Sequence, residues 1–116
     1  MTAQEIFDKA AVGLLTQKAR SYTESNNTGS CAYRGVNKRK CAAGFCIDDS
    51  WYVKEMERLP IDEVIINFKL EELKGHEKLL SNLQLLHDCE PMGSWKIQLF
   101  QLARINGLST EKIDNL

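Results

Sequence analysis

The sequence lacks the long apolar run that a membrane-spanning helix needs. No segment approaches the roughly 18 consecutive apolar residues that cross a bilayer. The N-terminus has no basic stretch followed by an apolar one, as an export signal would have. We therefore expect a chain that stays in the cytosol where it is made and has no membrane partner.

The sequence also lacks the short motifs that mark several enzyme classes. It contains no GxxxxGK[ST] loop, no GxGxxG after a predicted strand and no HExxH. Phosphate binding by a glycine-rich loop and zinc peptidase chemistry are therefore not supported. Four cysteines are present, but no two of them form a CxxC pair. In a reducing compartment such cysteines are thiols or metal ligands more often than disulfides.

The composition of the sequence is that of one globular domain over residues 1–116, with 43% hydrophobic and 27% charged residues. A net charge of −1 hides an uneven distribution. Residues 18–40 carry six bases against one acid, whereas residues 48–77 carry nine acids against four bases. This asymmetry is typical of two complementary faces of a small domain, or of a basic surface that binds a partner or nucleic acid.

Helical spacing of apolar residues predicts most of the secondary structure. Thr2 and Glu5 have the spacing of a capping box at the start of the first predicted helix. Gly75 is expected to divide the fourth helix, and Gly107 to end the fifth. The predicted helices cover residues 3–17, 51–59, 61–68, 71–88 and 95–106. For residues 61–68 a strand is the alternative, because Val64, Ile65 and Ile66 favour one.

The last predicted helix is apolar nearly all round. Trp95, Leu99 and Ala103 form one apolar face, while Ile97 and Ile105 lie off that face. Such a helix is either central to the core or has a second face covered by another chain. A homodimer is therefore one expected state.

Between the first two helices, the order of residues predicts a small β-hairpin over about residues 31–42. Two short runs flank the turn-forming residues 35–38, which would place Cys31 near Cys41. The fold class predicted overall is α+β, mostly α, with four to five helices packed around this hairpin. Gly44 is expected to mark a close approach of backbone to a neighbouring element.

The cysteines and histidines suggest two kinds of site, a zinc site and a thiol enzyme. The spacing C-x9-C-x4-C followed by H-x-C has no zinc knuckle, so buried free thiols are the favoured interpretation and no cofactor is expected. A cysteine nucleophile beside His87 and Asp88 is an alternative, but any chain with these residue types offers one. The residues concerned are Cys31, Cys41, Cys46, His87 and Cys89.

The predicted hairpin carries the densest positive charge in the chain. Its tip makes a small cationic surface with aromatic residues, which we predict to bind a partner: Tyr33, Arg34, Lys38, Arg39 and Lys40. Nucleic acid or a nucleotide is an alternative ligand for the same surface. The sequence pI of about 6.1 argues against nucleic acid, because dedicated binders usually carry a clear positive excess.

Cys31-x-Tyr33-Arg34-Gly35, followed by Lys40-Cys41-Ala42-x-Gly44-x-x-Ile47, resembles a group of small uncharacterised bacteriophage and prophage proteins. The resemblance implies a virus of bacteria as source and the host cytoplasm as location, and it transfers no site residues. Short phage accessory proteins without enzymatic motifs commonly bind a host protein. The leading hypothesis is therefore binding that modulates or inhibits a host protein, with anti-defence activity as one instance. The binding face would be the basic hairpin or the acidic surface from Asp48 to Glu77.

Overall fold

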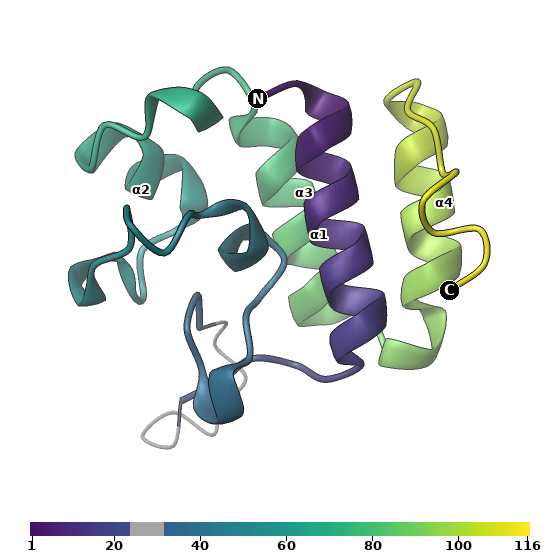
Figure 1. Cartoon of the computed structure of the whole chain (residues 1–116), viewed down its shortest axis with the longest axis horizontal. Coiled ribbons are helices and arrows are strands. Elements are labelled where there is room, and N and C mark those ends of the chain that lie inside the picture. Colours follow the sequence, from purple (N-terminus) through teal and green to yellow (C-terminus); the bar gives the residue numbers. More distant parts are fainter. Residues whose placement is uncertain (24–31) are drawn as a thin grey trace.

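The computed structural model describes residues 1–23 and 32–116, and the elements it contains there are all helical. Figure 1 shows that α1, α3 and α4 lie side by side, with α2 on the opposite side of this bundle from α4. The α-helices are α1 (Ala3–Gln17), α2 (Ile61–Asn67), α3 (Glu77–Cys89) and α4 (Trp95–Ile105). The short 3-10 helices are η1 (Val36–Lys38), η2 (Ala43–Cys46), η3 (Lys54–Met56), η4 (Glu71–Leu73) and η5 (Met92–Ser94).

Helix α1 begins at the predicted capping box. The Thr2 hydroxyl accepts from the Glu5 amide at 3.1 Å, and the Glu5 carboxylate accepts from the Thr2 amide at 2.9 Å. Hydrogen bonding to the Glu5 carboxylate by the Thr2 amide, and then by the Thr2 side chain, holds the pKa of Glu5 below its usual range. The helix ends where Lys18 takes a left-handed conformation. Its buried face is made by Ile6, Phe7, Ala10, Ala11 and Leu14.

Helices α3 and α4 also follow the predicted pattern. Gly75, with φ of +91°, separates η4 from α3, so the predicted division is confirmed. Gly107, with φ of +65°, follows α4 and ends it as expected. At the start of α4, the Ser94 hydroxyl donates to the Pro91 carbonyl and does not cap the helix.

The turn η2 packs against both α1 and α3. Its residues Ala43 and Cys46 are buried, and Gly44 touches the backbone of Tyr33. A Cβ atom at Gly44 would lie 2.6 Å from the Tyr33 carbonyl oxygen, so the predicted close approach is confirmed. The core therefore extends from the helices into the irregular part of the chain.

The predicted α+β fold class is wrong, since the elements of the described residues are helices alone. The β-hairpin predicted over residues 31–42 does not form, because residues 32–42 contain no strand. The chain does reverse there, and the Gly35 amide donates to the Arg39 carbonyl at 2.8 Å. However, Asn37 and Lys38 have positive φ angles, and the neighbouring backbone groups bond to side chains from elsewhere instead of to a second strand. The predicted approach of Cys31 to Cys41 lies outside the described residues.

The helix predicted over residues 51–59 is also wrong, because only η3 forms there. The Asp48 carboxylate accepts from both the amide and the hydroxyl of Ser50, which closes a local turn where a helix was expected to start. Val53 is extended and Arg58 has a φ of +70°, so the chain cannot continue a regular helix through either residue.

Candidate partner-binding site

Arg34 lies at the centre of the irregular segment, with its side chain 19% exposed. The guanidinium donates to the carbonyls of Tyr33 and Gly44, both at 2.9 Å, and of Ile47 at 2.7 Å. It also forms an ion pair of 2.8 Å with the Asp49 carboxylate and lies over the Tyr52 ring. The planar fork of five donors suits this task, because it satisfies several acceptors from a single position. Arg34 thus organises the local backbone from within.

The Glu57 carboxylate holds the same segment from the other side. It accepts from the backbone amides of Tyr33 at 3.0 Å and Arg34 at 3.1 Å, and from the Tyr52 hydroxyl at 2.6 Å. Burial and then the bond to this carboxylate raise the pKa of Tyr52 above its ordinary value. The Tyr33 hydroxyl donates to the Leu59 carbonyl, and Tyr33 is only 3% exposed. Tyr33 is therefore a buried support of the predicted site.

Two polar side chains fix the segment that follows Arg34. The Gln17 amide group accepts from the Lys40 amide at 2.9 Å and donates to the Lys40 carbonyl at 2.8 Å. The Ser21 hydroxyl lies 2.6 Å from the Ala32 carbonyl oxygen and 3.2 Å from the Arg39 carbonyl oxygen. The end of α1 thereby sets the backbone path of residues 37–40, which we name the cationic loop.

Three of the five predicted site residues lie in the cationic loop. Lys38 is exposed, whereas Arg39 and Lys40 are partly buried. The ammonium of Lys40 lies 3.7 Å from the Asp49 carboxylate. Lys18 is exposed at the end of α1 and follows Gln17, which binds the Lys40 backbone. The five residues are thus divided into two supports, the buried Tyr33 and the partly buried Arg34, and a cationic surface.

The cysteine and histidine residues lie in separate surroundings. Cys46 is buried, and its thiol donates to the Ile6 carbonyl; burial raises the pKa of Cys46 to about 12. Cys41 is buried and Cys89 is exposed. In the described ranges, no three His, Cys, Asp or Glu side chains gather closely enough to hold a metal ion. Cys31 lies outside these ranges.

His87 is buried and bonded at both ring nitrogens. Its Nδ1 lies 2.8 Å from the Asp88 carboxylate, and its Nε2 accepts from the Ser21 backbone amide at 3.1 Å. These partners define a neutral ring with its proton on Nδ1. The ring stacks on Trp95 with centroids 5.6 Å apart. A general base needs a free nitrogen facing a nucleophile, and both nitrogens of His87 are already bonded within the fold.

Arg20 also serves the fold, although its charge counted toward the predicted basic surface. Its guanidinium donates to the carbonyls of His87, Asp88 and Glu90 at the end of α3. It lies 5.7 Å from the centroid of the Trp95 ring. The last carbonyls of a helix have no partner within it, and a cation there also complements the helix dipole.

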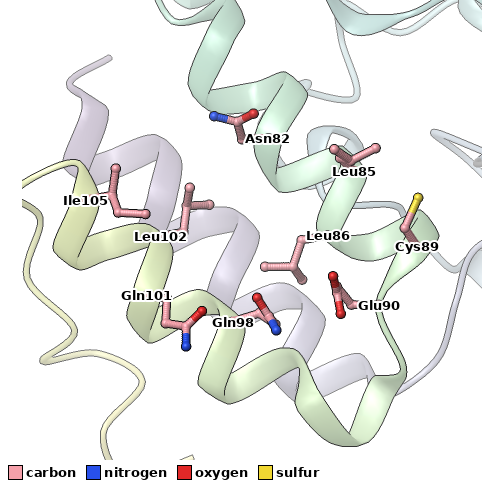
Figure 2. Close-up of a pocket in the computed structure, with 9 residues that line it drawn as sticks. All are labelled: Asn82, Leu85, Leu86, Cys89, Glu90, Gln98, Gln101, Leu102 and Ile105. Carbon is pink, nitrogen blue, oxygen red and sulfur yellow. The ribbon is translucent and has the colours of Figure 1, made fainter.

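A groove between α3 and α4 is a second candidate surface (Figure 2). Its volume is about 300 Å³, and Leu85 and Ile105 on its rim are strongly exposed. The sequence indicated a second apolar face on α4 through Ile97 and Ile105, but not which residues of α3 complete it. The groove is lined by Asn82, Leu85, Leu86, Cys89, Glu90, Gln98, Gln101, Leu102 and Ile105.

Comparison of the chain with protein-family models, curated proteins and solved structures gives no match. The resemblance to phage proteins therefore stays a prediction. None of the helices in the described part of the chain has the length and apolar character needed to cross a membrane.

Proposed function

We propose that this chain is a binding protein that modulates or inhibits a partner protein by covering an acidic part of the partner's surface with the cationic loop. One observation carries the proposal: polar side chains of the fold hold the backbone of the loop, while its cationic side chains stay wholly or partly exposed. Gln17 binds both backbone groups of Lys40, and Lys38 stays exposed.

This arrangement reduces the cost of binding. A free loop loses conformational entropy when a partner orders it, and a loop already ordered by its own fold avoids much of that loss. The surface lysines keep a flexible stem, so the charges adjust to a partner while the backbone does not. The loop therefore suits recognition, and the proposal requires no bond to be made or broken.

Local charges favour a protein over nucleic acid as the ligand. Asp49 lies 3.7 Å from the Lys40 ammonium and reduces the local positive potential. The segment from residue 48 to residue 77 is acidic and would repel an extended phosphate backbone. A protein surface with a small group of carboxylates matches three or four cations more closely than a duplex does. Nucleic-acid binding through the same loop is the alternative.

The nature of the partner is proposed from the sequence resemblance. The Tyr33-Arg34-Gly35 and Lys40-Cys41-Ala42 segments resemble those of small phage proteins, so the proposed partner is a protein of a bacterial host and the proposed compartment is the host cytoplasm. Inhibition would follow from occlusion of a functional surface, and anti-defence activity is one instance. A second copy of this chain is a separate candidate partner, on another face of the molecule.

The test is a pull-down from nuclease-treated bacterial lysate with three tagged proteins. The first is the wild type, and the second replaces Lys38, Arg39 and Lys40 with alanine. The third is a matched control that replaces Lys54, Lys69 and Lys74, which are exposed lysines of the acidic segment. We expect one stoichiometric protein with the wild type and the control, and its loss with the loop variant.

Two results would overturn the proposal. Retention of the same partner by the loop variant would remove the cationic loop from the binding surface. Loss of all captured material after nuclease treatment, together with oligonucleotide binding that weakens steeply with salt, would establish the nucleic-acid alternative. Circular dichroism of the loop variant checks that its helices are intact.

A further inference from the structure

The face formed by α3 and α4 has almost no charge. Of the nine residues that line its groove, only Glu90 is ionisable to a carboxylate, and Asn82, Gln98 and Gln101 are neutral amides. The protein as a whole has 27% charged residues, so a helix face exposed only to water would be expected to carry more. The composition of this face resembles the centre of an interface, where charged residues are depleted.

Large apolar side chains stand out of this face. Ile105 is 82% exposed and Leu85 is 60% exposed, on opposite sides of the groove. Ile97, also 60% exposed, lies about two turns before Ile105 on α4. Figure 2 shows Ile105 and Asn82 toward one end of the groove and Cys89 and Glu90 toward the other. Single exposed apolar residues are ordinary, but a group beside a groove marks a docking surface.

We propose that a second copy of this chain covers the α3–α4 face, through a two-fold contact in which the two groove faces meet. In such a contact the same surface serves both partners, so each group must be able to pair with a copy of itself or of a near neighbour. Amide side chains fulfil this condition, because each both donates and accepts hydrogen bonds. The three amides of the groove are therefore suited to a face that meets itself.

The few charges around the face also select this arrangement. Glu90 lies at the end where α3 meets α4, whereas Lys78 and Arg104 are exposed toward the other end of the same two helices. Within residues 1–23 and 32–116, none of these three side chains forms an ion pair. A two-fold axis across the middle of the groove places Glu90 of each copy near the basic end of the other. Glu90 of each copy then lies near the basic residues of the other, so the contact contains this pairing twice. The apolar residues of each copy lie over the groove of the other.

The size of the face predicts a modest affinity. Helices α3 and α4 have 13 and 11 residues, so each is about 16–20 Å long, and packed helices lie about 10 Å apart. The contact therefore covers a face of about 20 by 20 Å, which is small beside the roughly 800 Å² that each partner buries in a standard stable interface. We expect a weak dimer that dissociates on dilution.

The test is sedimentation equilibrium over about 5 µM to 1 mM, a range that covers the affinities of weak complexes. The variant Ile105→Glu introduces a charge at the rim of the groove. The matched control is Ile66→Glu on α2, where the isoleucine is 71% exposed and does not line the groove. Because both side chains are exposed, neither change affects the core. We expect the wild type and the control to dimerise, and Ile105→Glu to weaken association at least tenfold.

A charge exchange tests the two-fold geometry. Glu90→Lys and Arg104→Glu should each weaken association, and the double variant should restore most of it, because the pairing is only reversed. A wild type that stays monomeric to 1 mM overturns the proposal, as does an equal effect of the two isoleucine variants. If the double variant loses as much association free energy as the two single variants together, the antiparallel two-fold contact is overturned. If the wild type stays monomeric but a foreign protein binds the wild type and not Ile105→Glu, the second copy is replaced by that partner.

Discussion

The scaffold formed by α1, α3 and α4 and the irregular segment of residues 32–60 are ordered in different ways. In the scaffold, side chains such as Phe7, Leu80 and Leu99 are fully buried, and the backbone groups within each helix bond to one another except at the helix ends. In the irregular segment, backbone groups bond to individual side chains, chiefly those of Arg34, Glu57 and Gln17. Apolar burial orders the scaffold. In the irregular segment, hydrogen bonds from particular side chains to the backbone add to apolar burial.

This difference determines how damage spreads. Removing a core side chain from the scaffold weakens contacts among several helices at once, because packing is shared. Removing one polar side chain from the irregular segment leaves specific backbone groups without a partner, and the cost is that of those groups alone. The scaffold should therefore unfold cooperatively, whereas the irregular segment opens locally.

The largest expected effect comes from Phe7→Ala in the scaffold. Phe7 is fully buried on α1, and removing a buried phenylalanine costs about 3–5 kcal/mol. This is a large share of the total for a domain of this size, since such domains have about 5–15 kcal/mol. Urea unfolding followed by circular dichroism measures the loss. Thr16→Ala, at an exposed position of the same helix, is the control. A loss under about 1 kcal/mol for Phe7→Ala would mean that α1 does not pack in the core.

A smaller and more local effect is expected from Glu57→Ala. The change leaves two backbone amides and the Tyr52 hydroxyl without their acceptor, which we expect to cost about 2–3 kcal/mol. Hydrogen exchange should quicken at the amides of Tyr33 and Arg34 but not at that of Leu80 in α3. Glu55→Ala, at an exposed position of the same turn, is the control and should change neither quantity. Equal exchange at Leu80 would show that the two regions unfold as one unit.

The smallest effect is expected from the Cys46 thiol, through which the irregular segment contacts α1. Burial raises the pKa of Cys46 to about 12 from an ordinary value of 9.0, so the folded protein keeps this proton after the unfolded chain has lost it. The resulting stability is complete below pH 9 and is lost as the pH rises from 9 toward 12. Between pH 8 and pH 10 the loss should be about 1.4 kcal/mol. Cys46→Ser, which does not titrate in this range, should lack this part of the decline; parallel curves for the two proteins would contradict the assignment.

The scaffold could be predicted because its signals are local. The Thr2 and Glu5 capping box, the split at Gly75 and the stop at Gly107 each involve residues within a few positions of one another. Apolar spacing also predicts where α1 and α3 run. These features act through the geometry of a single helix, so the sequence window that contains the helix also contains the information.

The irregular segment could not be predicted because its partners are remote. The Tyr33 amide bonds to a side chain 24 residues away, and the Lys40 amide to one 23 residues away. A short run with a turn looks the same whether its backbone bonds to a second strand or to distant side chains. For the same reason, the positive charge of Arg34 predicted a surface cation, although its guanidinium is surrounded by carbonyl groups of its own fold.

Arg20 has a consequence for the order of folding. Its guanidinium completes the end of α3 across sequence separations of 67 to 70 residues, and this contact requires most of the chain to be in place. Closing so long a loop costs entropy before the contact contributes anything, and contacts of this kind slow folding. We therefore expect α3 to nucleate from its N-terminal turns, and its final turn to be fixed late, when the segment after α1 docks against it.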